Sequence, residues 1–277
     1  MTPDQYCQER AAGSGSSFYY SFLFLEPRRR QAITALYAFC REVDDVVDEC
    51  PDAELARTKL AWWRGEVKTL FEGHPSHPVT QALTTTLKSF YLPQEQLLEI
   101  IEGMEMDLEQ VRYADFKALH LYCYRVASVV GLLAAEIFGY HERQTLKYAH
   151  DLGLAFQLTN IIRDVGEDAR RGRIYLPQDE LARFGVSEAD LLNVNYSDNF
   201  RQLMAFQVER AQATYQQAFA QLPAADRKAQ RAGLVMAAIY RATLDEIVRD
   251  SYRVLDQRIS LPPLRKLWLA GKTWISA

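Results

Sequence analysis

Two short segments of the chain carry polar side chains at intervals of four residues. The first reads REVDDVVDE, and the second, LTNIIRDVGEDARRGRIYLP, follows the apolar run DLGLAFQL. Residues four apart share one face of an α-helix, so each segment predicts a row of oxygen atoms along one helix. The residues in the two rows are Asp44, Asp48, Asn160, Asp164 and Asp168. Carboxylates on largely buried helices are normally paired or metal-bound, although an isolated acidic pair is also typical of a solvated face.

The donor atoms of these rows favour Mg²⁺, with Mn²⁺ as an alternative. They are hard oxygens, whereas zinc and copper sites use His or Cys. A di-iron carboxylate bundle would need Glu-x-x-His, and none of the five histidines follows a glutamate by three positions. Mg²⁺ is usually held by one or two carboxylates together with substrate phosphates. Two facing rows therefore predict a phosphorylated ligand between them. Neighbouring arginines would either bind phosphate or pair within their own helix; they are Arg41, Arg163, Arg171 and Arg173.

Helical periodicity predicts the elements that must position these residues. Apolar residues recur at three and four positions along most of the chain, as at Ile33, Leu36, Tyr37 and Cys40, and no segment alternates convincingly with a period of two. Pro and Gly punctuate the pattern. The sequence therefore predicts an all-α bundle of roughly ten helices, with one domain over residues 1–277 and no linker or repeat.

Composition argues against several classes of protein. A hydrophobic content of 48% supports a large core, and the net charge of −4 argues against a nucleic-acid binder, which needs a basic surface. The four cysteines lack C-x-x-C spacing and the N-terminus lacks a secretory pattern. Both features favour a location in the reducing cytoplasm. The most apolar window, Val126 to Tyr140, is shorter than the roughly 20 residues that a spanning helix needs.

The C-terminal segment LPPLRKLWLAGKTWISA mixes aromatic, aliphatic and basic residues. Trp268 and Trp274 stand among Lys266 and Lys272. Two interpretations stay open: a helix that lies on a membrane surface, or a final helix packed on the core. A peripheral contact with the inner face of the plasma membrane is therefore an alternative to a purely cytoplasmic location.

Three segments, in this order and spacing, resemble the squalene/phytoene synthase family. They are SSFYYSFLFLEPRRRQAITALYAFCREVDDVVDE, YCYRVASVVGLL and QLTNIIRDVGEDARRGRIYLP. The resemblance extends from Tyr6 to Trp268 and implies the isoprenoid-synthase helical bundle with a large central cavity. It also implies a head-to-head prenyl transferase, in which the two rows hold Mg²⁺ against the diphosphates of two allylic substrates. Loss of diphosphate would leave a carbocation in an apolar cavity that excludes water.

The resemblance assigns roles to further residues. Tyr122 is a candidate base for the proton lost on capture of the carbocation, with the released diphosphate as an alternative acceptor. Positions that face the diphosphates in relatives match Tyr37, Arg41, Gln157, Arg163, Arg173, Tyr240 and Arg258. Positions that would line the prenyl-chain tunnel are Phe22, Val126, Val130 and Phe156. Where the family has S-x-S-F, this chain has Gly15 in place of the first serine, so only Ser17 is expected to reach phosphate; it could also cap a helix.

Among the reactions of this family, the sequence favours presqualene diphosphate synthase of hopanoid biosynthesis, acting on two molecules of farnesyl diphosphate. The segments GSSFYYSFLFL and RRGRIYLPQDELARFGV look most like those bacterial enzymes, and the bulk of Phe22 would shorten the tunnel towards a C15 chain. NADPH is not expected, because the reaction would stop at the cyclopropyl intermediate. Downstream isoprenoid enzymes are candidate partners. The alternatives are phytoene synthase acting on geranylgeranyl diphosphate, dehydrosqualene or squalene synthase, and an inactive helical adaptor.

Overall fold

Helices form the whole architecture of the computed structural model, which describes residues 1–13 and 17–277. The only β-bridge among these residues, between Arg112 and Ile174, is isolated. In chain order the α-helices are α1 (Pro3–Gly13), α2 (Ser17–Phe22), α3 (Pro27–Glu49), α4 (Ala53–Glu72), α5 (Pro78–Leu87), α6 (Gln94–Glu109), α7 (Phe116–Cys123), α8 (Val129–Phe138), α9 (Gln144–Arg170), α10 (Gln178–Phe184), α11 (Glu188–Leu192), α12 (Asp198–Gln221), α13 (Arg231–Arg249) and α14 (Pro263–Ser276). The expected all-α class is confirmed, but roughly ten helices was too few, because short helices such as α2 and α11 give no periodic signal.

The two helices that carry the polar rows, α3 and α9, are long and mostly surrounded by other helices. Helix α3 begins with Pro27 at its first position, where the missing N–H is not needed for an intrahelical hydrogen bond. Helix α9 runs for 27 residues, about 40 Å at the usual rise, and buries residues on most of its circumference. Each of the two polar rows therefore projects from a long helix that neighbours surround.

Helices α7 and α8 are joined by a single π-helical turn, η1 (Tyr124–Ser128), and form one run from Phe116 to Phe138. By length and composition this 23-residue run could cross a membrane, so the shorter window judged from sequence missed it. In this structure the run contacts α6 and α9 and contributes to the core. Gly153 of α9 allows the close approach, since a Cβ there would lie 2.5 Å from the Ala127 carbonyl oxygen.

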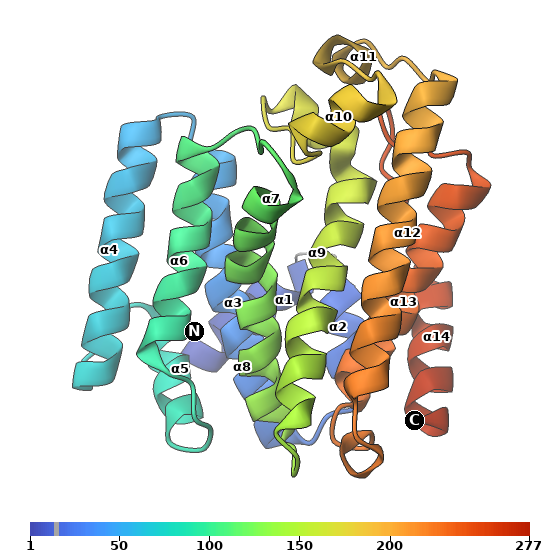
Figure 1. Ribbon diagram of the computed structural model, residues 1–277. Coiled ribbons are helices and arrows are strands. Elements are labelled where there is room, and N and C mark those ends of the chain that lie inside the picture. Colours follow the sequence, from blue (N-terminus) through green and yellow to red (C-terminus); the bar gives the residue numbers. More distant parts are fainter. Residues whose placement is uncertain (14–16) are drawn as a thin grey trace.

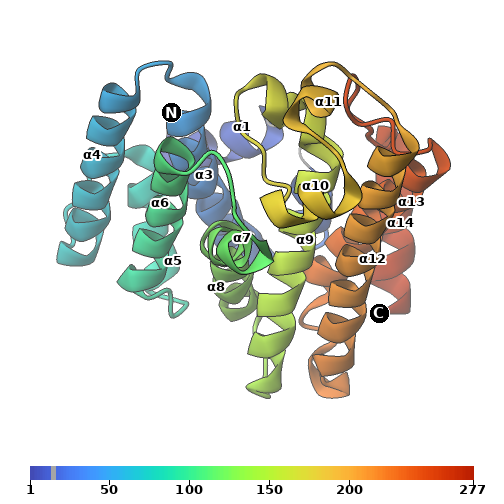
Figure 2. The same ribbon diagram turned by 45° about the horizontal axis from the view of Figure 1, so that its top comes forward.

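The long helices lie side by side (Figure 1), and α10 and α11 lie at one end of the bundle, beside α9 and α12, as the turned view also shows (Figure 2). Buried apolar side chains form two large clusters. One draws mainly on α1, α3, α4, α5, α6 and α8, and the other on α7, α9, α12 and α13. The partly buried Val126 packs against both clusters and lines the cavity that lies between them.

Candidate active site

A cavity of about 750 Å³ lies in the middle of the bundle. Side chains from α2, α3, α6, α9 and α13, from the α7–η1–α8 run and from residues 258–266 line it. Acidic and basic side chains gather where α3 and α9 end, and aromatic and small apolar side chains line the remainder. The cavity thus joins a charged region to an apolar one.

Almost all residues singled out in the sequence line this one cavity. Those lining it are Phe22, Tyr37, Arg41, Asp44, Asp48, Tyr122, Val126, Val130, Phe156, Gln157, Asn160, Arg163, Asp164, Asp168, Arg173, Tyr240 and Arg258. The expected phosphate contact of Ser17 and the departure at Gly15 lie outside the residues and side chains that the structure describes. The shared location brings the candidates together, while the role of each residue stays a prediction.

The row on α3 separates two adjacent acids. Asp44 lines the cavity, where its carboxylate accepts a 2.5 Å hydrogen bond from Arg41. The next residue, Asp45, points towards α1, where Arg10 donates to it at 2.5 Å. Arg41 also reaches Asp45. The cavity-facing acids of this helix are therefore Asp44 and Asp48, four residues apart.

The row on α9 contains one acid that pairs with arginines and two residues whose side-chain oxygens have no such partners among the described residues. Asp164 accepts two hydrogen bonds from Arg163, at 2.8 and 2.5 Å, and two from Arg258, at 2.9 and 3.4 Å. Among the described residues none donates a hydrogen bond to the carboxylate of Asp168, and the buried Oδ1 of Asn160 has no hydrogen-bond partner there. Asn160 and Asp168 thus present unused acceptor oxygens to the cavity.

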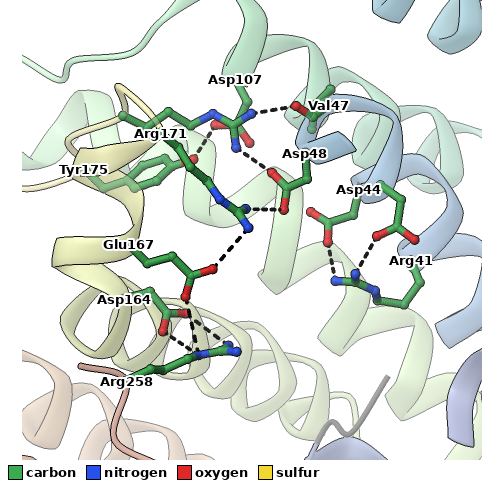
Figure 3. A network of polar contacts seen from close by, with 12 residues as sticks. Arg41, Asp44, Val47, Asp48, Asp107, Asp164, Glu167, Arg171, Tyr175 and Arg258 are labelled. Carbon is green, nitrogen blue, oxygen red and sulfur yellow. Dashed lines mark hydrogen bonds and ion pairs between the residues drawn. The ribbon is translucent and has the colours of Figure 1, made fainter. Parts of the chain in front are cut away.

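Arginines connect the two rows across the cavity (Figure 3). Arg171 donates to Asp48 at 3.0 Å and pairs with Glu167 at 3.1 Å, so it spans from α3 to α9. Arg173 donates to Asp48 at 2.6 Å and to the carbonyl of Val47 at 2.8 Å. Within residues 1–13 and 17–277, no three His, Cys, Asp or Glu side chains are grouped closely enough to hold an ion as they stand. The guanidinium groups occupy the space between the acids.

The surroundings shift the pKa values of three of these acids in different directions. Burial, followed by the charge of Asp48, raises the pKa of Asp44 to about 7. Burial, followed by the charge of Asp164, raises the pKa of Asp168 to about 8. Burial alone would also raise the pKa of Asp164, but hydrogen bonds and positive charge from Arg163 and Arg258 bring it below its ordinary value. Burial and neighbouring carboxylates therefore outweigh the charge of Arg41 at Asp44 and that of Arg173 at Asp168.

These observations fit a divalent cation such as Mg²⁺. Asn160 contributes an unpartnered amide oxygen, and Asp44 and Asp168 contribute carboxylates that burial and like charges destabilise as anions. An oxygen-only donor set suits Mg²⁺ better than zinc or copper. The two rows and the arginines between them therefore form a suitable place for a metal–diphosphate group.

The sequence missed a buried hydrogen-bonded group beside these rows. Asp107 of α6 accepts hydrogen bonds from Tyr122 at 3.0 Å and from Tyr175 at 2.7 Å, and all three line the cavity. Burial raises the pKa of Asp107 to about 6, although both tyrosine hydrogen bonds oppose the shift. A signal was present, because Asp107 continues the apolar three-and-four spacing of Leu97, Ile100 and Met104.

Arg258 reaches the site because a loop packs directly on α9. The amide of Gly166 donates to the carbonyl of Val254 at 3.1 Å, and a Cβ at Gly166 would lie 1.9 Å from the carbonyl oxygen of Leu255. Arg170 also donates to that oxygen at 2.5 Å. The absence of a side chain at Gly166 thus lets the loop carry Arg258 to Asp164, although 94 residues separate the pair in sequence.

The apolar part of the cavity has an aromatic wall and a wall of small residues. The ring of Phe22 packs edge-on against Phe18 and Tyr37, with centroid distances of 6.2 and 6.4 Å. Small residues from α8, η1, α9 and α13 line it elsewhere; they are Ala127, Gly131, Ala134, Ala135, Ala149, Gly153, Ala232 and Gly233. Phe22 is therefore only one part of the wall, since small residues of four other elements also line the cavity.

Comparisons with known proteins agree with this geometry. The squalene/phytoene synthase family model matches residues 11–265. The chain is 39% identical over 274 residues to a phytoene synthase of Arthrospira platensis, which covers 94% of this chain and 89% of that enzyme. It is 38% identical over 272 residues to a chloroplastic phytoene synthase of an Oncidium hybrid cultivar, with 95% of this chain covered but only 64% of the relative.

Two crystal structures have the same helical arrangement. That of a dehydrosqualene synthase in complex with ligand superposes with a TM-score of 0.91 at 29% identity, covering 99% of this chain and 96% of that one. That of a squalene synthase from Alicyclobacillus acidocaldarius superposes with a TM-score of 0.80 at 29% identity, covering 90% and 94%.

These comparisons correct the reaction expected from the sequence. Curated relatives at 36 to 39% identity, matched over 94 to 98% of this chain, are phytoene synthases. The choice of a presqualene diphosphate synthase acting on two farnesyl diphosphates in hopanoid biosynthesis was therefore wrong. It depended in part on the size of Phe22, which forms only a portion of the cavity wall.

Proposed function

Because the chain belongs to the squalene/phytoene synthase family, we propose that it is a phytoene synthase, which joins two molecules of geranylgeranyl diphosphate head to head. The observation that carries this proposal is the pair of oxygen rows on α3 and α9, which line one end of an apolar cavity. Helices that held acids on opposite faces of the molecule could not act on a common diphosphate. The phytoene synthase relatives support the choice of the C20 substrate.

The charged end of the cavity would bind the diphosphates. Asp44, Asp48, Asn160, Asp164 and Asp168 are the candidate ligands of Mg²⁺, which when bound would act as a Lewis acid on the leaving diphosphate. An incoming diphosphate would compete with Asp48 and Asp164 for the guanidinium groups that now pair with them, because Arg binds phosphate and carboxylate in the same forked geometry. The arginines concerned are Arg163, Arg171, Arg173 and Arg258.

The apolar end would hold the two prenyl chains. Its aromatic and small aliphatic residues would keep water away, so a carbocation formed there would meet the double bond of the second chain before it met water. The burial of Phe156 and Tyr240, whose ring centroids lie 4.9 Å apart, closes one side of this space. Exclusion of water and alignment of the two chains are thus the main contributions of this wall.

The proton lost after capture needs an acceptor. Burial raises the pKa of Tyr122 well above its ordinary value, so the neutral phenol is a poor base by itself. Its hydroxyl already donates to Asp107 at 3.0 Å, so Tyr122 could accept a proton only while passing its own to that carboxylate. We therefore place Asp107 with Tyr122 in this step. The released diphosphate is the second candidate acceptor.

The test is incubation of the purified protein with Mg²⁺ and labelled geranylgeranyl or farnesyl diphosphate, without NADPH. Formation of a C40 product from geranylgeranyl diphosphate is the expected result. Exclusive use of farnesyl diphosphate would refute the C20 assignment and favour a dehydrosqualene synthase, whose structure superposes closely. Turnover of neither substrate by the folded protein would favour the inactive adaptor.

A further inference from the structure

Charged side chains connect the N-terminal helix α1 to α3, which carries the first row of acids. Arg10 of α1 donates to Asp45 at 2.5 Å, and its Nε lies 2.7 Å from a carboxylate oxygen of Glu42. Tyr6, one turn earlier on α1, donates to the same Glu42 oxygen at 2.7 Å. None of these four side chains is among the described residues that line the cavity. Arg10 thus joins two acids of α3 that lie outside the cavity.

Asp45 extends this connection to the cavity. Its Oδ2 accepts the hydrogen bond from Arg10, and its Oδ1 accepts one from Arg41 at 2.5 Å. Arg41 lines the cavity, where its other terminal nitrogen donates to Asp44 at 2.5 Å (Figure 3). These four side chains therefore form a series of alternating charges that runs from α1 to the cavity.

The acid in the middle of this series is better shielded from solvent than the arginines on either side. The side chain of Asp45 is 12% exposed, against 37% for Arg10 and 38% for Arg41. Loss of one partner of a shielded ion pair is costly, because the remaining charge stays out of water without compensation. The arrangement of Asp45 therefore depends on both arginines, and a change at Arg10 alters the carboxylate that Arg41 meets.

The two terminal nitrogens of Arg41 have partners of different kinds. Asp44 is a candidate metal ligand, so it would exchange Arg41 for the ion, whereas Asp45 lies outside the cavity and would keep its hydrogen bond. A guanidinium group is planar and its donors point in fixed directions, so a hydrogen bond at one edge determines where the other edge points. The edge that Asp44 leaves would then face the cavity, ready for a phosphate oxygen.

Arg10 limits how much of Arg41 the Asp45 carboxylate can hold. Carboxylates often bind a guanidinium group through both oxygens at once. Because Arg10 occupies one oxygen of Asp45, only the other is available to Arg41. Without Arg10, Asp45 could bind Arg41 through both oxygens and draw it away from the cavity.

We propose that Arg10 and Asp45 are positioning residues for the diphosphate site. Arg10 occupies one oxygen of Asp45, and the other oxygen holds Arg41 at the cavity with one edge available to the ligand. Helix α1 thereby contributes to diphosphate binding although none of its described side chains lines the cavity. The inference rests on the proposed function, which identifies a diphosphate as the ligand.

Binding of inorganic pyrophosphate in the presence of Mg²⁺, measured by isothermal titration calorimetry, tests this inference without any prenyl substrate. Arg10→Gln should raise the Kd about tenfold, which corresponds to about 1.4 kcal/mol. In an Arg41→Gln protein the same change should have no further effect, because both residues act through one route. Arg10→Lys should raise the Kd only about threefold, since lysine keeps the charge but lacks the forked geometry.

Arg64→Gln is the matched control. Arg64 is 31% exposed and joins α4 to α6 by two hydrogen bonds to Glu105, at 3.1 and 2.5 Å, and neither residue is among those that line the cavity. This variant should keep the wild-type Kd, with circular dichroism and the melting temperature as checks of the fold. In the condensation assay, Arg10→Gln should raise KM and leave kcat nearly unchanged, because it weakens binding of substrate and transition state alike.

Three outcomes would show that Arg10 only fixes α1 to α3. These are a wild-type Kd in folded Arg10→Gln, an equal loss in Arg64→Gln, or an undiminished effect of Arg10→Gln in the Arg41→Gln protein. If Arg10→Gln does not fold, Arg10→Lys supplies the same comparisons. Failure of the proposed function is separate, because a protein that turns over neither prenyl diphosphate could still bind pyrophosphate in the manner that depends on Arg10.

Discussion

Ala134 allows a direct test of the chain length that the cavity accepts. It lies on α8, one turn after Val130 and one turn before Phe138, and all three line the cavity. Geranylgeranyl diphosphate exceeds farnesyl diphosphate by one isoprene unit of five carbons. Burial of that unit is worth about 4 kcal/mol, at about 0.8 kcal/mol per carbon, which sets an upper limit of about 1,000-fold on the C20 preference in kcat/KM.

The variant Ala134→Phe places an aromatic ring in the apolar part of the cavity, which the prenyl chains would fill. We expect the ratio of kcat/KM for the C20 and C15 substrates to fall by about 100-fold or more, because the longer chain loses its burial and must bend. Competition between equimolar labelled substrates, with products separated by chain length, measures the ratio. Circular dichroism and the melting temperature check the fold.

Ala61→Phe is the matched control, because Ala61 lies on the exposed side of α4 and does not line the cavity. It should leave the ratio unchanged. If Ala134→Phe stays folded and keeps the wild-type ratio, the cavity near α8 does not hold the prenyl chain and the reasoning fails. A wild-type enzyme that prefers the C15 substrate would refute the reasoning before any variant is made.

Three further predictions follow from the contacts. Asp48→Asn and Asp164→Asn should keep the helical fold but lower turnover by about 100-fold or more, since each removes a candidate metal ligand; wild-type kinetics at saturating Mg²⁺ would contradict this assignment. Gly166→Ala should destabilise the fold by about 1 to 3 kcal/mol in urea unfolding and raise KM, because its Cβ would displace the loop that carries Arg258; an unchanged KM would separate Arg258 from substrate binding. Asp226→Asn should cost about 2 kcal/mol at pH 7, since the buried Asp226 carboxylate accepts hydrogen bonds from the amides of His141 and Glu142 and from Thr145. Those hydrogen bonds outweigh burial and lower the Asp226 pKa to about 2. The stability advantage of the wild type should therefore be complete above pH 5 and shrink as the pH falls through about 4 towards 2. A pH-independent difference in stability would exclude the carboxylate charge as its cause.

Local sequence was sufficient for the helical class and for most of the candidate site. Spacing of four residues on an apolar helix selects one face, and this is why Asp44 and Asp48 could be chosen from an acidic cluster that also contains Asp45. The resemblance to the family supplied Gln157, Tyr240 and Arg258, which no local pattern distinguishes. All the candidate site residues whose side chains the structure describes line the cavity, and the side chain of Ser17 is not among those described.

Contacts between distant segments were beyond such reasoning. The Asp107 group joins α6, α7 and the segment after α9, and Gly166 admits a loop from almost 90 residues further along the chain. Chain-length selectivity also depends on contacts between distant segments. Several helices form the cavity wall, so one bulky residue, Phe22, cannot define the selectivity.

The sequence by itself determined that this chain forms helices with two oxygen rows, since periodicity and spacing are properties of neighbouring residues. Only the tertiary structure decided that the rows face one cavity, which arginines occupy the space between them, and how much apolar space lies beyond. Those features depend on helix packing, where a missing Cβ or a small side chain changes the distance between segments far apart in the chain.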